Sequence, residues 1–413
     1  MAPRAAVSPA RRAAFDVLRR VFEDDAFADL AFPTAAKGLD ERDRALAQRL
    51  AFGAVQRVRT LDFAIETLGR RPVRKLDAPV RAALRLGAYQ LGFADGVPRY
   101  AAVNESVELV RAARLERAVA FTNAVLRRLA DGIEALLADL PDDTPAAAGL
   151  AHSYPDWIAE TWWRDLGGAA AAELMRAQNE PPDRVVRLLR GQIDGRPDEL
   201  IPNAWHVDRV DASAVAEGRV WPQSLGSQLA GLAVGAQEGE RTLDLCAAPG
   251  GKTTMLAGEV VAVEVNDARA RELEVAVRRV GATNVRVVTA DGRALPPELT
   301  DFERALVDAP CSGLGVLNGR PDLRWRAEPL PDLQLELLRA AAERVRPGGT
   351  VTYSVCTINA DESEAVVDAS GLDVDSSLAD EWPHFRHPTR PEFLQTLPHV
   401  HGTSGFFIAR LRR

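Results

Sequence analysis

Two short segments each place a cysteine just beyond an apolar run that is typical of a buried strand. Asp308-Ala309-Pro310-Cys311-Ser312 follows residues 304–307, and Cys356-Thr357 follows residues 350–355. A thiolate that adds to carbon 6 of cytosine makes carbon 5 enamine-like, so that carbon 5 can take a methyl group. A second group must then remove the proton of carbon 5 before the thiolate leaves. Two cysteines at neighbouring strand ends meet both needs, and the pair therefore indicates methylation of cytosine at carbon 5.

Asp308 adds a charged group to this predicted site. Its carboxylate could bind the exocyclic amine and the ring nitrogen of the base and stabilise charge as it develops. A cysteine thiol with an ordinary pKa of about 8.5 is mostly protonated at neutral pH. The site must therefore lower that pKa or supply a base, and the sequence leaves both routes open.

A third segment has the composition of a ligand-binding loop. It reads Asp244-Leu245-Cys246-Ala247-Ala248-Pro249-Gly250-Gly251-Lys252-Thr253-Thr254 and joins an apolar strand to an expected helix. Small residues and two glycines let the backbone approach a ligand, and the start of a helix would offer N–H groups. A phosphate-binding P-loop requires glycine where this chain has Cys246, and the dinucleotide pattern G-x-G-x-x-G is also missing. Neither nucleotide motif therefore fits the loop.

Two acidic residues extend this predicted cofactor site. Glu264 ends the second predicted strand, at a distance from Asp244 at which an acidic residue commonly accepts hydrogen bonds from ribose hydroxyls. Asp291 ends the third predicted strand and could meet the adenine side of a ligand. S-adenosylmethionine carries a ribose, an adenine and a zwitterionic tail but no phosphate. The loop and the two carboxylates therefore predict S-adenosylmethionine as the cofactor.

The last part of the chain alternates short apolar runs with amphipathic helices, which are expected at about 268–280 and 333–345. This alternation predicts an α/β, Rossmann-like domain with a doubly wound, mostly parallel sheet. Ligands bind such sheets beyond the carboxyl ends of the strands, where the candidate functional residues lie. The predicted strands are Thr242–Cys246, Val260–Val265, Val285–Thr289, Arg304–Val307 and Thr350–Val355.

The N-terminal third is expected to be all-helical, because its apolar residues recur at three- and four-residue spacing. Glycine and proline predict helix breaks at Ala31–Pro33, Gly69–Pro72 and Gly96–Pro98. The sequence thus predicts three parts: an all-helical RNA-binding domain at 1–140, a linker with a small mixed α/β subdomain at 141–235, and a catalytic domain at 236–413.

The composition, 46% hydrophobic and 27% charged, is that of a globular protein. We find neither an apolar run of membrane-spanning length nor a signal peptide, and we expect a cytoplasmic protein without a membrane partner. The three cysteines form no CxxC pair, so we expect neither a disulfide framework nor a metal site.

The net charge of −8 argues against nucleic-acid binding through a general positive surface. Residues 1–140, however, hold 23 Lys and Arg against 18 Asp and Glu, a charge of +5, which leaves −13 on the remainder. This distribution fits an appended module that contacts RNA. Alternatively, residues such as Arg70, Arg71, Arg74 and Lys75 simply solvate helix faces.

The motifs resemble the Sun/Fmu (RsmB-type) family of bacterial 16S ribosomal RNA cytosine-5 methyltransferases, which carry an N-terminal NusB-like domain. The resemblance covers nearly the whole chain, and the pair of cysteine motifs is highly specific. In the catalytic part it is carried by Leu243–Thr254, Asp308–Gly315, Tyr353–Thr357 and Gly402–Leu411. Upstream it is carried by Asn104–Val107, Asn123–Arg127 and His152–Trp157.

The resemblance implies that Cys356 attacks carbon 6 and that Cys311 assists release of the product. It also implies that the target is a cytosine in 16S ribosomal RNA, which the enzyme must unstack at a cost of a few kcal/mol. We expect the protein to act as a monomer. The residues that the resemblance places on the cofactor are Cys246, Ala247, Ala248, Pro249, Gly250, Gly251, Lys252, Glu264, Asp291 and Asp308.

The chain departs from the family pattern at a few positions, all away from the residues of this chemistry. These departures bear on the choice of RNA target more than on the reaction. Asn318-Gly319-Arg320 replaces a more basic stretch, and Ser224 replaces an acidic residue after Gln223. Leu189 stands where asparagine is common, and Ser404 where aspartate is usual.

Three alternative functions stay open on the sequence. The first is methylation of another RNA. The second is methylation of an amino group, although Cys311 stands where such enzymes carry an aromatic residue. The third is a non-catalytic RNA-binding assembly or antitermination factor, in which the helical domain would dominate.

Overall fold

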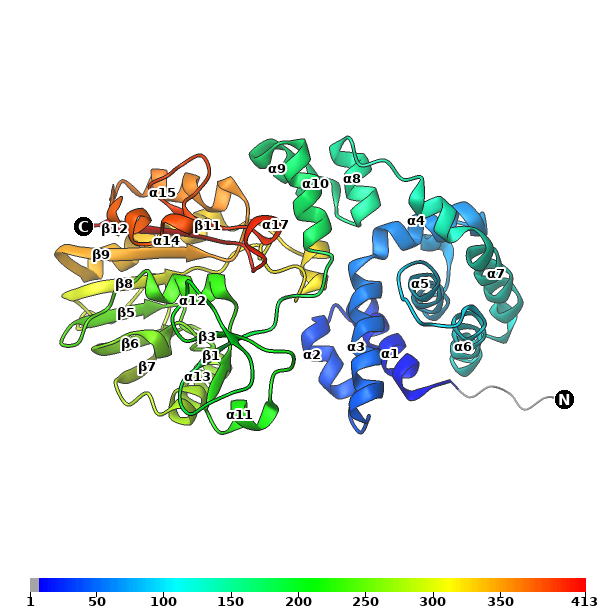
Figure 1. Cartoon of the computed structure of the whole chain (residues 1–413), viewed down its shortest axis with the longest axis horizontal. Coiled ribbons are helices and arrows are strands. Elements are labelled where there is room, and N and C mark those ends of the chain that lie inside the picture. Colours follow the sequence, from blue (N-terminus) through cyan, green and yellow to red (C-terminus); the bar gives the residue numbers. More distant parts are fainter. Residues whose placement is uncertain (1–6) are drawn as a thin grey trace. The chain divides into compact units, whose positions relative to one another are not determined.

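The computed structural model describes residues 7–413, which divide into two compact units. The helical unit comprises the residues up to Asn179 together with Leu317–Arg326, and the sheet unit comprises Glu180–Val316 and Ala327–Arg413. Figure 1 shows the first as helices in blue to green and the second as a sheet flanked by helices. The predicted division at residues 140 and 235 stays a prediction.

Within the helical unit, the helices between residues 9 and 138 pack around one continuous apolar core. Asp40 caps α3 by accepting a hydrogen bond from the backbone N–H of Asp43 at 2.8 Å, as expected at a helix start. Its elements are α1 (Pro9–Glu23), α2 (Ala28–Ala35), α3 (Glu41–Gln56), α4 (Val58–Gly69), η1 (Val73–Lys75), α5 (Ala78–Gly92), α6 (Arg99–Ala112), α7 (Glu116–Ala138), α8 (Pro145–His152), α9 (Asp156–Leu166), α10 (Gly168–Ala177) and η3 (Pro321–Trp325).

The predicted helix break at Ala31–Pro33 is wrong, because α2 continues through Pro33 to Ala35. Proline lacks an N–H and clashes with the preceding turn in a long helix. Pro33 is the sixth of the eight residues of this short helix, so its missing N–H removes only one backbone hydrogen bond of the helix. The breaks at Gly69–Pro72 and Gly96–Pro98 are confirmed, since α4 ends at Gly69 and α6 begins after Pro98.

The segment Leu317–Arg326 completes the helical unit although it comes from far along the chain. The guanidinium of Arg324 is fully buried and lies 4.2 Å from the centroid of the Tyr154 ring. One of its nitrogens donates to the carbonyls of Gln56 and Ser153 and to Oδ1 of Asn179, at 3.1–3.2 Å. Burial lowers the pKa of Arg324 to about 10. Only a partner set of this kind makes such a buried cation tolerable.

The sheet unit confirms the predicted α/β fold. Its large sheet has the order β10-β12-β9-β8-β5-β6-β7, with β11 paired to β12. Strands β5 to β9 are parallel, and β10, β11 and β12 run antiparallel at one side. The strands are β5 (Arg241–Leu245), β6 (Glu259–Glu264), β7 (Val285–Thr289), β8 (Phe302–Asp308), β9 (Val345–Val355), β10 (Asp373–Val374), β11 (Leu394–Thr396) and β12 (Phe406–Arg412).

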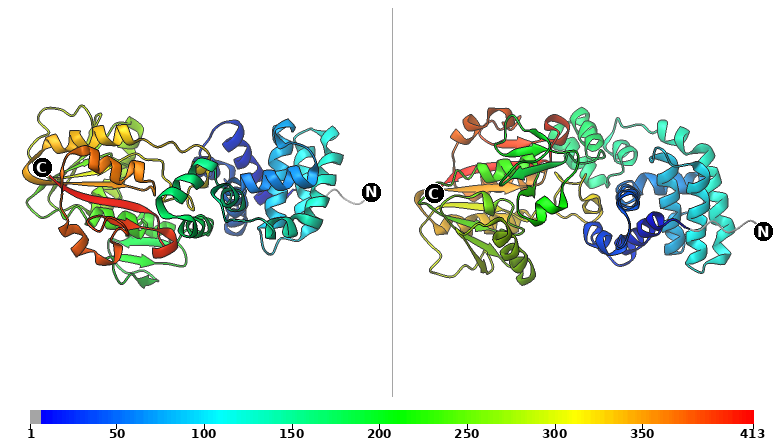
Figure 2. Two further views of the ribbon diagram at one scale, coloured as in Figure 1. Left: turned by 90° about the horizontal axis from the view of Figure 1, so that it is seen from above. Right: turned by 60° about the horizontal axis from the view of Figure 1, so that its bottom comes forward.

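Helices cover both faces of this sheet, as the views of Figures 1 and 2 show. Val261 and Val263 of β6 belong to the apolar cluster that contains α14, whereas Ala262 packs in the cluster of α13. Because alternate residues point to opposite faces and both faces are covered, the middle of β6, Val260–Val263, is apolar at every position. The helical elements are α11 (Ala212–Ala216), α12 (Leu225–Leu232), η2 (Thr253–Met255), α13 (Asp267–Val280), α14 (Pro331–Arg344), η4 (Ala360–Glu362), α15 (Glu364–Ser370), α16 (Ser377–Glu381), η5 (Pro383–Phe385) and α17 (Pro398–His401).

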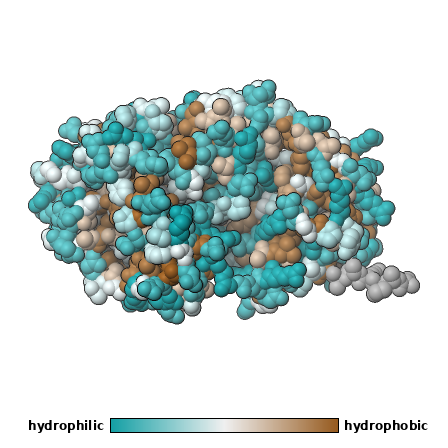
Figure 3. Space-filling model, viewed as in Figure 1, coloured by the Kyte–Doolittle hydropathy of each residue, from teal (hydrophilic) through white to brown (hydrophobic). Residues whose placement is uncertain are grey.

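A small antiparallel sheet precedes the large one, with the order β2-β3-β1-β4. Its strands are β1 (Val185–Leu188), β2 (Arg196–Pro197), β3 (Ala204–His206) and β4 (Val220–Pro222). Figure 3 shows that hydrophilic residues predominate on the visible face, with apolar residues in small scattered groups. No helix within residues 7–413 is long and apolar enough to cross a membrane.

Candidate active site

The two cysteines singled out in the sequence lie side by side at the carboxyl ends of β8 and β9. The Sγ atoms of Cys311 and Cys356 are 3.4 Å apart, within hydrogen-bond distance for two sulfur atoms. The pairing follows from the fold, because β8 and β9 are parallel neighbours with Asp308 opposite Ser354. The hydrogen bond to Cys356, followed by burial, holds the pKa of the Cys311 thiol well above its usual range. Cys311 therefore keeps its proton while that hydrogen bond is present.

Asp308 and Lys252 join the cysteine region to the predicted cofactor loop. Lys252 Nζ donates to Asp308 Oδ2 at 2.8 Å, and Ser354 Oγ donates to Asp308 Oδ1 at 2.7 Å. The ammonium group also lies 4.9 Å from the centroid of the Phe406 ring. These contacts hold the carboxylate at the point where the loop after β5 meets the ends of β8 and β9.

A close glycine contact fixes the segment after Cys311. The backbone N–H of Gly315 donates to the carbonyl of Cys356, and that of Gly405 donates to the carbonyl of Gly315. A Cβ on Gly315 would lie 1.9 Å from the carbonyl oxygen of Gly405, so no larger residue fits there. The segment Gly405-Phe406 at the start of β12 thus contacts the backbone that follows Cys311.

The cofactor loop follows β5, but it does not lead into the helix that the sequence predicts. Only the three-residue 3-10 turn η2 (Thr253–Met255) follows the loop. Thr253 explains the short turn, since its Oγ1 donates back to Asp244 Oδ2 at 2.6 Å and to the carbonyl of Ala247 at 3.2 Å. Such local bonds compete with helical hydrogen bonding. The predicted helix at this point is therefore wrong.

Backbone conformation makes the loop compact. Cys246 has a φ of 75° and Gly250 a φ of 103°, values that L side chains rarely adopt. A Cβ on Gly250 would lie 2.7 Å from Leu273 of α13. The loop can turn this tightly against α13 because it consists of glycine and other small residues.

Two buried groups lie at the start of the loop. Burial raises the pKa of Asp244 to about 7, and its Oδ1 is a buried acceptor without a hydrogen-bond partner in the described structure. Burial likewise raises the pKa of the Cys246 thiol to about 12. At neutral pH this thiol is protonated, and a protonated thiol is a poor nucleophile.

The two predicted cofactor carboxylates have different surroundings. Glu264, at the end of β6, is buried, and its Oε1 accepts a hydrogen bond from the N–H of Asn266 at 3.0 Å. Its Oε2 is 3.7 Å from the nearest nitrogen of Arg269. Asp291 is partly exposed and held by Arg293, which lowers the pKa of Asp291. Within residues 7–413, no other predicted site residue forms a hydrogen bond or an ion pair with the Asp291 side chain.

These residues fit S-adenosylmethionine. Asp244 Oδ1 has no hydrogen-bond partner in the described part of the chain, and the nearest cationic nitrogen to Glu264 Oε2 lies 3.7 Å away, so both oxygens can accept a further hydrogen bond. S-adenosylmethionine carries hydroxyl and ammonium groups that can donate one. The glycines of the loop leave room for its backbone to approach a ligand. No group of three or more His, Cys, Asp or Glu within residues 7–413 could hold a metal ion.

Sequence reasoning missed three contributors: Ser354, Phe406 as the ring beside Lys252, and Glu362. Ser354 and Phe406 both lie in strands, so the sequence alone gives no reason to distinguish them from residues of the core. Glu362 stands among other acidic residues on what reads as a solvated turn. Only the fold brings these side chains to the site.

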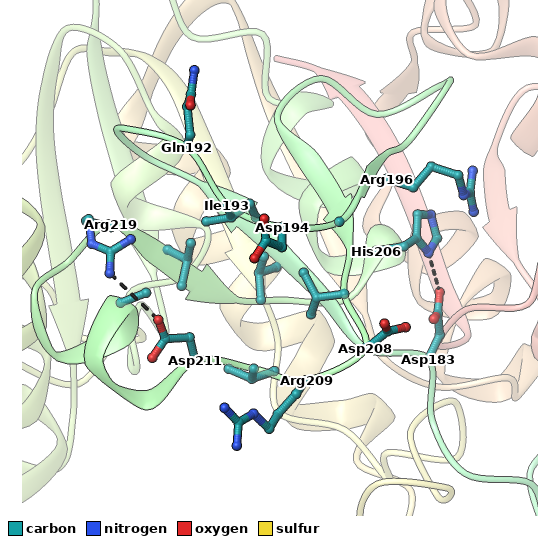
Figure 4. A pocket seen from close by; sticks show the side chains of 16 residues that line it. Asp183, Gln192, Ile193, Asp194, Arg196, His206, Asp208, Arg209, Asp211 and Arg219 are labelled. Atoms are coloured by element: carbon teal, nitrogen blue, oxygen red, sulfur yellow. Dashed lines mark ion pairs between the residues drawn. The ribbon is translucent and has the colours of Figure 1, made fainter.

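A further hollow of the sheet unit lies elsewhere, beside the small sheet (Figure 4). It measures about 940 Å³, and its walls carry three arginines and four aspartates, among them Asp183, which is ion-paired to His206, and Asp211, which is ion-paired to Arg219. The described Cys311, Cys356 and Asp308 do not line it. We therefore assign the chemistry to the strand ends and not to this hollow.

Comparison with known proteins agrees with both units. Residues 232–412 match the family "16S rRNA methyltransferase RsmB/F", and residues 8–131 match the NusB family. The structure resembles that of PH0851, with a TM-score of 0.78, 22% identity and full coverage of both chains, which shows a shared fold. NSun6 from Pyrococcus horikoshii has a TM-score of 0.55 and 21% identity over 63% of this chain and 98% of its own.

Relatives of known family cover almost the whole chain. The probable ribosomal RNA small subunit methyltransferase B of Synechocystis sp. is 34% identical over 98% of this chain and 99% of its own length. The ribosomal RNA small subunit methyltransferase B of Thermus thermophilus is 36% identical over 90% of this chain and 89% of its own. The chain therefore belongs to the RsmB/F family of S-adenosylmethionine-dependent 16S rRNA methyltransferases, with an N-terminal NusB-like domain.

Proposed function

We propose that the protein methylates carbon 5 of a cytosine in 16S ribosomal RNA through a covalent adduct on Cys356. The observation that carries the proposal is the 3.4 Å separation of the Cys311 and Cys356 sulfur atoms at the ends of adjacent strands. A single nucleophilic cysteine would suffice for many reactions. Two thiols at one substrate position suit a reaction in which one adds to the base and the other helps to remove a proton.

In the proposed reaction, Cys356 adds to carbon 6 and forms an S–C bond, which places negative charge on the base. Lys252 would stabilise this negative charge, and Asp308, which Lys252 holds at 2.8 Å, would accept a hydrogen bond from the exocyclic amine of the base. S-adenosylmethionine, when bound, supplies the methyl group as a sulfonium. Carbon 5 takes this methyl group and then loses its proton, with Cys311 assisting. The S–C bond breaks as the double bond re-forms, which frees Cys356.

We propose that the loop residues Cys246–Lys252, Glu264, Asp291 and Asp308 hold the cofactor. The buried Glu264 would accept hydrogen bonds from the ribose hydroxyls, which can satisfy its less occupied oxygen. Asp291 is more exposed and would contact the adenine of the cofactor. Its pairing with Arg293 fixes the orientation of its carboxylate.

We further propose that the helical unit contacts the RNA backbone through a basic surface formed by the α4–η1 turn and α7. The exposed side chains of this basic surface are Arg70, Arg71, Arg74, Lys75, Arg117 and Arg128.

Contacts hold the two parts of this surface together. Arg71 lies 5.4 Å from the Phe121 ring centroid, and Arg128 donates to the carbonyl of Leu68 at 3.4 Å. Asp77, paired with Arg117 at 3.3 Å, neutralises only part of the charge. Positive side chains so arranged bind phosphates, largely without regard to sequence.

The decisive experiment incubates the full chain with labelled S-adenosylmethionine and unmodified 16S RNA and identifies the labelled nucleoside by chromatography beside authentic 5-methylcytidine and N4-methylcytidine, which have the same mass. The proposal expects 5-methylcytosine from the wild type and none from Cys356→Ala. A methylated exocyclic amine would overturn the carbon-5 assignment, and an active Cys356→Ala variant would overturn the covalent mechanism.

A further inference from the structure

Glu362 is a fully buried carboxylate that lies between the two cysteine segments. Its Oε1 accepts three hydrogen bonds, from the backbone N–H groups of Ser312 and Leu330 at 3.0 and 3.1 Å and from Gln334 Nε2 at 2.9 Å. The same amide nitrogen of Gln334 also donates to the carbonyl of Pro310 at 2.9 Å. One oxygen atom of Glu362 thus fixes the backbone on both sides of Cys311.

The other oxygen, Oε2, faces the residues next to the cysteines. It accepts a short hydrogen bond from Ser312 Oγ and a longer one, at 3.4 Å, from Thr357 Oγ1. The two hydroxyls are also bonded to each other at 2.8 Å. Ser312 follows Cys311 and Thr357 follows Cys356, so Glu362 connects both cysteine segments through their next residues.

A carboxylate buried in this way is costly unless donors satisfy it. Here six hydrogen bonds reach it, the last from Asn359 Nδ2 at 3.4 Å, and all six donors are uncharged groups. Because donors surround both of its oxygens, the carboxylate of Glu362 is held in one orientation. The contacts are unequal, because both polar groups of Ser312 bind more closely than the single hydroxyl of Thr357. Loss of Glu362 should therefore release the Cys311 segment first.

We infer that Glu362 is a positioning residue that holds the Cys311 segment in place for resolution of the Cys356 adduct. This inference rests on the proposed function. Cys356 lies at the end of β9, whose pairing with β8 and β12 does not need Glu362. Without Glu362, adduct formation should therefore persist while proton removal slows. Displacing a catalytic group by about 1 Å can cost roughly 100-fold in rate.

The test compares Glu362→Ala with Glu362→Gln in the full chain, on unmodified 16S RNA with S-adenosylmethionine. Glu362→Ala should form product about 100-fold more slowly and accumulate a covalent protein–RNA band on a denaturing gel. Glu362→Gln keeps the size and one acceptor oxygen, and the hydroxyls of Ser312 and Thr357 can turn to accept from its amide. It should stay within about tenfold of wild type without accumulating the band.

A merely structural role would lower the amount of folded protein but would not accumulate an adduct. The inference is overturned if Glu362→Ala makes product at the wild-type rate, if it loses activity without the covalent band, or if Glu362→Gln behaves like Glu362→Ala. Should Glu362→Ala fail to fold, Ser312→Ala decides by the same readouts, because it removes only the hydroxyl that Glu362 binds most closely. Activity in Cys356→Ala would instead refute the proposed function itself.

Discussion

Lys252 and Asp308 form a hydrogen-bonded ion pair of 2.8 Å that links the loop after β5 to the end of β8. The pair joins the part of the chain that we assign to the cofactor with the part that we assign to the base. Both side chains are partly buried, with 11% of Lys252 and 30% of Asp308 exposed. Pairs with restricted water access couple more strongly than surface pairs.

Replacing Lys252 by Met should therefore lower kcat more than it affects cofactor binding. The substitution keeps most of the apolar stem but leaves Asp308 with only the Ser354 hydroxyl. We expect a fall in kcat of about 10²–10³-fold, the usual cost of removing one charge-stabilising donor. Steady-state methylation with calorimetry of cofactor binding checks this. A change confined to the cofactor Kd would contradict a role of Lys252 at the base.

Cys311→Ala should retain adduct formation and lose product release. Its thiol lies 3.4 Å from the Cys356 sulfur, and the hydrogen bond to Cys356 is the main cause of its raised pKa. Once Cys356 is bonded to carbon 6 that cause is removed, so Cys311 can lose its own proton and then accept the proton of carbon 5. We expect a covalent protein–RNA complex that survives a denaturing gel. The double variant Cys311→Ala/Cys356→Ala is the control and should form none. A Cys311→Ala variant with normal turnover would exclude the assigned role.

Asp244 should make the sheet unit less stable as pH rises. Burial raises its pKa from 3.8 to about 7, so the folded state holds a proton that the unfolded state has lost between these values. The stabilisation is complete below pH 3.8 and is lost as pH rises through about 7, by up to about 4 kcal/mol.

The Asp244→Asn variant removes this titration and keeps an acceptor for Thr253. Its melting temperature relative to wild type should rise from pH 4 to pH 8, as measured by thermal unfolding without cofactor. Asp373→Asn, at an exposed position, is the matched control. A constant difference between Asp244→Asn and wild type across this range would contradict the burial argument.

Gly315→Ala should damage the active site although Gly315 touches no substrate. The added Cβ would lie 1.9 Å from the Gly405 carbonyl, so either the Cys311 segment or β12 must move. We expect a loss of about 1–3 kcal/mol in unfolding free energy and a disproportionate fall in kcat. Gly132→Ala is the control, because its Cβ would make only ordinary contacts with Leu68 at 3.5 Å or more. Equal activity of both variants would argue against this constraint.

The basic surface should contribute to RNA affinity without contributing to sequence choice. Replacing Arg71, Arg74 and Lys75 together by alanine removes three exposed charges from it. We expect weaker binding of all RNA sequences alike. The slope of the logarithm of the binding constant against the logarithm of the salt concentration should become shallower by about one for each lost phosphate contact. Filter binding at several salt concentrations measures both. The triple variant Asp29→Ala/Glu41→Ala/Asp43→Ala alters charge elsewhere on the unit and should leave the slope unchanged.

Much of the fold could be read from local patterns. Each predicted strand from Thr242 to Val355 corresponds to a strand of the sheet, with ends shifted by a few residues. The failures came where side chains override local rules. Thr253 bonds back to Asp244 and prevents a helix, and α2 tolerates Pro33 in its interior at the loss of one hydrogen bond. Periodicity does not register either effect.

The sequence by itself determined the family of S-adenosylmethionine-dependent rRNA methyltransferases, and the spacing of Cys311 and Cys356 after two strands led to the proposed reaction at carbon 5. Only the tertiary structure decided which groups work together. The 3.4 Å contact of the sulfur atoms and the six hydrogen bonds to Glu362 join residues that are far apart in the chain. Such distances depend on strand pairing and packing, and no single segment encodes them.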